Sequence, residues 1–129
     1  MMMLSAAPNV VRPMTIEDAV RVLHDLGDEG APLAGGTWVM RTQHRGATFV
    51  GTYVSVHGLA SLRGIDLGVL PRIGALVTHA ELAEATLPPA LIGLGIAAAT
   101  SAFPAVRSVA TLGGNLGASP FPEADLVPA

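Results

Sequence analysis

Two pairs of adjacent glycines are the residues in this sequence whose type and spacing could do chemistry. The first pair lies in PLAGGTWVM, residues 32–40, and the second in TLGGNLGASPFPEAD, residues 111–125. Glycine allows backbone conformations that a side chain would block, so consecutive N–H groups can point at one anion. We expect the second stretch, like the first, to be a non-helical loop. The pairs are then either two ordinary turns or two halves of one anion-binding site.

A dinucleotide pyrophosphate is the kind of anion that such a neutral, directional cradle binds. Gly35-Gly36-Thr37 is expected where a strand passes into a helix, whose N-terminus would add its dipole. Thr111 and Asn115 could donate side-chain hydrogen bonds beside the second pair, and Asp125 could accept one from a ribose hydroxyl. Yet the chain holds 15 glycines, so a single pair is more often a tight turn. Neither stretch matches GxGxxG or the lysine-containing P-loop, and both interpretations stay open at this point.

The elements of the first half predict a strand–helix–strand unit. NVVRP, residues 9–13, is expected to be a strand, and Thr15 with Asp18 resembles the capping box that begins a helix. Gly27 would end this helix. APLA (31–34) and TFVGTYVSV (48–56) follow as strands, with a short helix over TWVMRTQH (37–44) between them. The apolar residues at helical spacing are Ile16, Ala19, Val20, Leu23 and Leu26.

The pattern changes near residues 56–61, which we take as a boundary. Short strands are expected in 60–68 and 71–77, then a second capping box from Thr78 to Glu81. An Ala/Gly-rich helix is expected over residues 90–102. The predicted fold class is therefore α/β (α+β), with an N-terminal βαβ subdomain at residues 1–58 built on a small parallel sheet. Residues 59–129 would form the first, incomplete part of a second mixed α+β subdomain.

Composition excludes several classes of function. A net charge of −3 with scattered charges gives no basic surface for nucleic acid. With no cysteine, the chain alone can hold neither a disulfide nor an iron–sulfur cluster. The four histidines show no metal-ligand spacing, and we interpret His79 as an ordinary first-turn residue. No serine lies in GxSxG and no acid–base pair is evident, so we predict no catalytic side chain and no metal site.

One uncharged segment is long enough to be considered as a membrane span. No charged residue lies between Glu84 and Arg107. Prolines near both ends and glycines in the middle favour a buried helix over a span, and a membrane-associated protein remains the weakest alternative. The N-terminus lacks a basic region followed by a long apolar run, so we expect no signal peptide and a cytoplasmic protein.

The amino-acid sequence around the two glycine pairs resembles that of a known family. The segments are PLAGGTWVM, LASLRGI, RIGALVTHAELAE and VRSVATLGGNLGASPFPEADLVPA, in this order. Together they resemble the PCMH-type FAD-binding subunit or domain of the molybdenum hydroxylases. That family includes xanthine dehydrogenase, aldehyde oxidoreductases and the medium subunit of aerobic carbon monoxide dehydrogenase. The resemblance covers most of the chain, and residues 107–129 are its most specific part.

The resemblance implies an FAD site and a role in electron transfer. Ser101 falls where some relatives contact the flavin, and Asp125 matches an acid that holds the adenosine part. Partners implied are a molybdopterin-binding large subunit and a 2Fe–2S small subunit, with electrons passing through FAD to NAD or another acceptor. The first loop implied consists of Pro32, Leu33, Ala34, Gly35, Gly36, Thr37, Trp38 and Val39. The second consists of Thr111, Leu112, Gly113, Gly114 and Asn115.

Three points qualify the resemblance. Trp38 stands where relatives often have a small acid, and we favour packing over a flavin contact for its ring. Arg107 matches a basic residue that the family tends to keep before the second pair, although a surface ion pair would also explain it. Relatives continue beyond ADLVPA, so we expect a truncated or split member. The alternative function is a non-catalytic remnant of the fold that acts only as a protein-interaction piece.

Overall fold

A small parallel sheet forms the first half of the molecule. The computed structural model describes residues 6–41, 44, 46–117 and 126. Its strands are β1 (Asn9–Val11), β2 (Gly30–Leu33) and β3 (Thr52–Ser55), in the order β1-β3-β2 and all parallel. Val54 of the central strand pairs with Val11 on one side and Pro32 on the other. The predicted α/β class with a small parallel sheet is confirmed.

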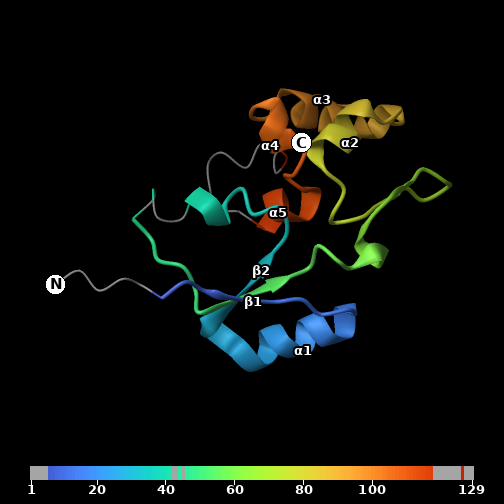
Figure 1. The fold of residues 1–129 in the computed structure, drawn as a ribbon. Coiled ribbons are helices and arrows are strands. Elements are labelled where there is room, and N and C mark those ends of the chain that lie inside the picture. The colour runs from blue at the N-terminus through green and yellow to red at the C-terminus, as the bar shows by residue number, and fades with distance from the viewer. Residues whose placement is uncertain (1–5, 42–43, 45, 118–125, 127–129) are drawn as a thin grey trace.

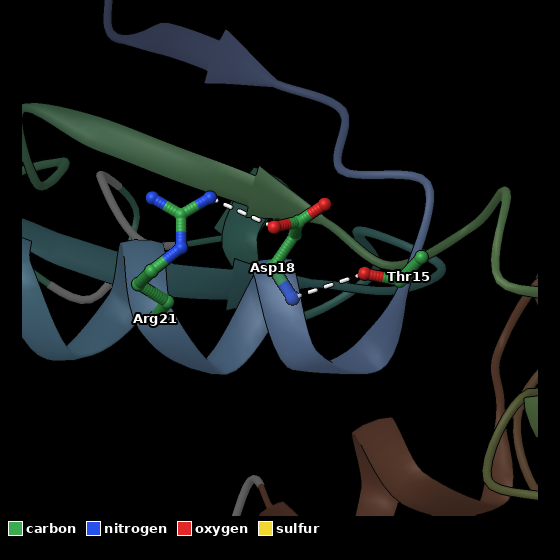
Figure 2. Close-up of polar contacts among 3 residues, drawn as sticks. All are labelled: Thr15, Asp18 and Arg21. Carbon is green, nitrogen blue, oxygen red and sulfur yellow. Dashed lines mark hydrogen bonds and ion pairs between the residues drawn. The ribbon is translucent and has the colours of Figure 1, made fainter.

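Helix α1 (Ile16–Leu26) covers one face of this sheet, as Figure 1 shows. Thr15 caps it, because its Oγ1 accepts a hydrogen bond of 3.1 Å from the Asp18 N–H, and Gly27 ends it at φ 53°. The Asp18 carboxylate does not complete a capping box in this structure. It instead accepts a hydrogen bond of 2.7 Å from Arg21, one turn further along (Figure 2).

The apolar stripe of α1 is narrower than the sequence predicted. Ala19 is buried with Val54 and Leu59, while Ile16 is 38% and Val20 59% exposed. A sheet of three short strands has too little surface to cover the whole apolar stripe. The side of α1 that faces the sheet carries Ala19 and Val22, and Val20 lies outside it. Val22, Leu23 and Leu26 complete this first core, together with Val56 and Leu62.

Two short 3-10 turns lie in the connections of this sheet, one before β2 and one after it. A 3-10 turn, η1 (Gly27–Glu29), leads from α1 into β2. Of the helix expected over residues 37–44, the structure describes the 3-10 turn η2 (Val39–Arg41) and His44, which is also in 3-10 conformation, while residues 42 and 43 lie outside the described residues. A 3-10 turn of three residues carries little dipole, so the helix dipole expected behind the first glycine pair stays a prediction.

The second half is mostly helical. The 3-10 turn η4 (Ala60–Leu62) precedes a small antiparallel pair, β4 (Ile65–Asp66) and β5 (Arg72–Ile73). Helix α2 (His79–Glu84) begins with the predicted capping box of Thr78 and Glu81, which is confirmed. The 3-10 turn η5 (Pro89–Leu91) leads into α3 (Ile92–Thr100), followed by α4 (Pro104–Arg107) and α5 (Leu112–Gly117).

A second core lies among these helices. Val77, Leu82, Ala98 and Leu126 are buried together, and Leu112 of α5 packs against them. In Figure 1, α2, α3 and α4 form one layer, and α5 lies between that layer and the sheet. The division at residues 58 and 59 stays a prediction, although Leu59 and Leu62 pack with the first core. Within the described residues, no helix combines the length and the apolar character needed to cross a membrane.

Candidate functional site: two glycine segments around a shared cavity

The first glycine pair forms a loop directly after β2. The backbone of Gly35 packs so closely on the Val109 carbonyl that a Cβ at this position would overlap its oxygen. Gly36 has φ 77°, a conformation that L side chains rarely adopt. Among the described residues, the hydrogen bonds recorded leave the N–H groups of Gly35, Gly36 and Thr37 without an acceptor. These N–H groups are therefore available to a ligand.

The second glycine pair is helical, which corrects the prediction of a loop. Gly113 and Gly114 lie in the first turn of α5, and their N–H groups are already used within the protein. Gly113 donates to the Ala75 carbonyl at 2.8 Å, and Gly114 donates to Thr111 Oγ1 at 3.0 Å. Leu112 donates to the Val77 carbonyl at 2.9 Å. The backbone of this segment therefore offers no second N–H cradle, and its glycines instead permit close packing, since a Cβ on Gly113 would lie 2.8 Å from that of Ala75.

Side chains of the second segment still present donors. The Asn115 Oδ1 accepts a hydrogen bond of 3.0 Å from the Leu126 N–H, which directs its amide NH₂ group elsewhere. Thr111 accepts from Gly114 and keeps its own hydroxyl proton to donate. Both residues are 5% exposed. The predicted role of Thr111 and Asn115 as donors is thus compatible with the geometry and stays a prediction.

The two glycine segments meet at one cavity. A Cβ added to Gly114 would lie 3.8 Å from the Cβ of Ala34, so the two segments are close neighbours. The cavity has a volume of about 480 Å³ and opens on the sheet face opposite α1, where Ala31 and Tyr53 line it. Of the predicted site residues, those lining it are Pro32, Ala34, Gly35, Gly36, Thr37, Trp38, Val39, Thr111, Gly113, Gly114 and Asn115.

A second cavity of about 820 Å³ adjoins the first. The two share the Gly35–Trp38 loop, His79, Ala110 and Asn115. Ser101 lines this second cavity, at the carboxyl end of α3. Phe103 and Met40 also line it and are 80% and 72% exposed, so its wall is apolar and open to solvent.

His79 is a site residue that the sequence interpretation missed. It is 3% exposed, and its Nδ1 lies 2.7 Å from Ser101 Oγ. The Ser101 hydroxyl donates a hydrogen bond of 2.9 Å to the Ala98 carbonyl, so its oxygen accepts one from the Nδ1–H of the imidazole. His79 is the first residue of α2, as predicted, but it is buried between two cavities. The only sequence signal was its place in the segment THAEL.

Arg107 supports the wall that carries Ser101. Its guanidinium donates to the Ala102 carbonyl at 2.7 Å and to the Ser101 carbonyl at 3.3 Å. Ala102 has φ 48°, and a non-glycine residue in this region requires support from its surroundings. Arg107 therefore holds a turn of the backbone in this structure, where we had considered a surface ion pair.

Two of the predicted site residues that the structure describes do not line the cavities. Leu33 lies in β2, where its carbonyl accepts a hydrogen bond of 3.0 Å from Val56, and Leu112 packs on the second core. Asp125 falls outside the described residues. Within the described part, no group of three or more His, Asp or Glu side chains could hold a metal ion.

Comparison with known proteins assigns this arrangement to a family. A model described as the FAD binding domain in molybdopterin dehydrogenase matches residues 5–129. The chain belongs to this family. The resemblance predicted from the glycine segments is confirmed, and FAD is the cofactor that membership of the FAD-binding domain family supports.

Relatives of the FAD-binding domain family agree with this assignment. The chain is 39% identical over 109 residues to the xanthine dehydrogenase FAD-binding subunit of Escherichia coli O157:H7, which covers 81% of this chain and 37% of that protein. It is 34% identical over 106 residues to the 6-hydroxypseudooxynicotine dehydrogenase complex subunit alpha of Paenarthrobacter nicotinovorans, covering 79% and 35%. Reconstituted CO dehydrogenase from Oligotropha carboxidovorans superposes with a TM-score of 0.72 at 30% identity, over 88% of this chain and 40% of that one. The chain thus spans well under half the length of these relatives.

The residues present fit a dinucleotide. Ligand pockets have volumes of roughly 300–1,000 Å³, and each of the two adjoining cavities lies in this range. The loop shared by both cavities carries the available N–H groups of Gly35, Gly36 and Thr37. Any residue other than glycine at position 36 would have a strained backbone, because φ is 77° there. A ligand with an anionic centre and two bulky ends fits this arrangement, with its centre at the shared loop and one end in each cavity.

Proposed function

We propose that this chain binds FAD across the two glycine segments and acts as an electron-transfer module of a molybdopterin-dependent oxidoreductase. The observation that carries the proposal is the close approach of the segments at Ala34 and Gly114, beside one cavity. Bound FAD would supply the redox chemistry, accepting and passing on electrons. The protein's part is to bind the cofactor, orient it and exclude water.

Each group of residues has a separate part in this proposal. The N–H groups of Gly35, Gly36 and Thr37 would hold the diphosphate, because these residues form the loop that lines both cavities and their N–H groups have no acceptor among the described residues. The hydroxyl of Thr111 and the amide of Asn115 would add side-chain donors. Ser101 would line the flavin end, and Asp125 would accept from the adenosine part.

The partners proposed follow from the relatives. One relative is named as the FAD-binding subunit of xanthine dehydrogenase, and another as subunit alpha of the 6-hydroxypseudooxynicotine dehydrogenase complex. We extend this to a molybdopterin-binding large subunit and a 2Fe–2S small subunit, with NAD or another molecule as the acceptor. Iron–sulfur clusters would have to be held by those partners, since this chain has no cysteine.

A second candidate function is a protein-interaction piece without a cofactor. Apolar side chains exposed on α3 and on the following turn favour it, because Ile96 is 60% and Phe103 80% exposed. Large exposed apolar residues in one region are typical of interaction surfaces. The two functions differ in one measurable property, which is the retention of FAD.

The experiment that tests the proposal is a titration of the purified chain with FAD. Trp38 is the single tryptophan and lines both cavities, so its emission reports on this site. We expect saturable quenching of Trp38 by FAD, with weaker binding of FMN. Circular dichroism of the same samples would establish that the chain is folded.

Two glycine variants provide the matched comparison. Gly36→Ala adds a methyl group to the loop at φ 77°, whereas Gly64→Ala adds one at φ 91° in open space away from both cavities. Both changes cost about 1–2 kcal/mol of backbone strain. Weaker FAD binding by Gly36→Ala alone would support the site. A folded wild-type chain that does not bind FAD would contradict the proposal and favour the interaction piece.

A further inference from the structure

Arg41 is the one permanently charged side chain among the described residues that line either cavity. The described residues in the wall of the first cavity include no Arg, Lys, Asp or Glu. The second has Arg41 alone, contributed by η2, which directly follows the first glycine loop. Among the described residues of this wall, no carboxylate competes for the guanidinium, so one cation among apolar and neutral groups favours an anionic ligand.

The backbone fixes Arg41 to the glycine loop. The Met40 N–H donates to the Gly36 carbonyl at 2.9 Å, and the Arg41 N–H donates to the Trp38 carbonyl at 3.1 Å. These two hydrogen bonds make the loop and the turn one short unit. The available N–H groups and the arginine therefore belong to the same local structure.

The guanidinium of Arg41 stacks on the ring of Trp38. The Cζ atom of Arg41 lies 5.6 Å from the centroid of the Trp38 ring, within the range of a cation–π interaction. Such stacking restricts a long and otherwise flexible side chain while its N–H donors stay at the edge of the plane. The ring that we expected only to pack thus has a second role in positioning Arg41.

The donors of Arg41 are not used elsewhere in the described part. The ion pair recorded there is between Arg21 and Asp18, and the side-chain hydrogen bonds recorded there do not include the Arg41 guanidinium. A guanidinium has five N–H donors in a planar fork, which matches the oxygens of a phosphate in bidentate geometry. A diphosphate carries negative charge that neutral backbone N–H groups do not balance.

We infer that Arg41, held by Trp38, is the cationic contact for the diphosphate part of the cofactor and so determines the preference for a phosphorylated ligand. This inference rests on the proposed FAD site and adds a residue outside the two glycine segments. Arg41 acts on the ligand directly, and Trp38 is a positioning residue.

The test compares ligands with and without phosphate on a charge-matched pair of variants. Arg41→Gln removes the cation from the cavity, and Arg12→Gln removes an equal charge from an exposed position that lines neither cavity. FAD, ADP and riboflavin are titrated at low salt and at about 0.15 M ionic strength. Flavin emission and the emission of Trp38 provide two readouts that need no enzyme activity.

We expect Arg41→Gln to weaken FAD and ADP roughly tenfold at low salt, the loss typical of one charge-assisted hydrogen bond. The affinity for riboflavin should not change, and the salt dependence of FAD binding should become shallower. Arg41→Lys should retain much of the salt dependence, because it retains the charge. Trp38→Leu, followed by flavin emission, should weaken FAD by a smaller factor than Arg41→Gln.

Several outcomes would overturn the inference while leaving the proposed FAD site intact. One is that Arg41→Gln binds FAD with the affinity and salt dependence of the wild type. Another is that Arg41→Gln and Arg12→Gln weaken FAD equally, since net charge alone would then explain the effect. Equal weakening of riboflavin and FAD would place Arg41 at the flavin rather than at the diphosphate. A folded wild-type chain that binds no FAD would overturn the proposed function and this inference together.

Discussion

The imidazole of His79 at the start of α2 is joined to the hydroxyl of Ser101 at the end of α3, with 2.7 Å between Nδ1 and Oγ. The Ser101 hydroxyl donates a hydrogen bond to the Ala98 carbonyl, so the two hydrogen bonds run in one direction, from His79 to Ser101 to Ala98. Both residues are 3% exposed. This hydrogen bond links two helices and is almost fully buried, so it fixes how those helices meet beside the second cavity.

Ser101→Ala should destabilise the protein by about 1–3 kcal/mol, because it leaves the buried Nδ1–H of His79 and the Ala98 carbonyl without their partner. Ser108→Ala is the matched control. Its hydroxyl also donates to a carbonyl three residues earlier, that of Ala105, but it is exposed and water can replace it. The measurement is urea unfolding of both variants. Equal losses in the two variants would contradict a special role for the His79–Ser101 pair.

Gly35→Ala should lower the thermal unfolding midpoint and weaken FAD binding together. The added methyl group would overlap the Val109 carbonyl oxygen, and the loop after β2 would have to move away from the segment before α5. Overpacking of this kind costs about 1–3 kcal/mol. Gly58→Ala, where no atom lies within 4 Å of the new Cβ, is the control and should unfold like the wild type. Normal stability of Gly35→Ala would mean that the two segments are not tightly packed.

Leu82→Ala should cost about 2–5 kcal/mol of unfolding free energy, because Leu82 is fully buried in the second core between α2 and α3. Leu70→Ala removes the same atoms from a side chain that is 75% exposed, and should change stability by less than about 0.5 kcal/mol. Chemical denaturation monitored by circular dichroism would measure both. A similar small change in the two variants would be inconsistent with a second core.

The pKa of Asp18 lies below its ordinary value of 3.8, chiefly because Arg21 donates a hydrogen bond to its carboxylate, with Thr15 as the next contribution. A lowered folded pKa means that Asp18 contributes stability above its unfolded pKa and loses that contribution as pH falls through the folded pKa. NMR titration of the Asp18 carboxyl carbon would measure the pKa. Arg21→Gln should raise it toward the ordinary value, and an unchanged pKa would remove Arg21 as the cause.

Short-range features of this protein were predictable from sequence. Thr15, Gly27 and the Thr78–Glu81 capping box act through contacts within four residues, so their residue types alone indicate the helix ends. The strand–helix–strand pattern likewise predicted the parallel sheet. The glycine pairs and the segments around them were specific enough to indicate the family, which the comparison confirmed.

Contacts between residues far apart in the sequence determined the features that could not be predicted. The second glycine pair became helical because Val77 and Ala75 supply carbonyls to Leu112 and Gly113 from more than thirty positions away, and no local pattern records that. His79 became a buried partner of Ser101 because two helices meet, and Arg41 came to face the cavity because η2 turns back on the glycine loop. Local propensity determined the ends of α1 and the start of α2, because those contacts lie within a few residues. The helical state of α5 and the carbonyls, faces and cavities that the elements share depend on how the whole chain packs.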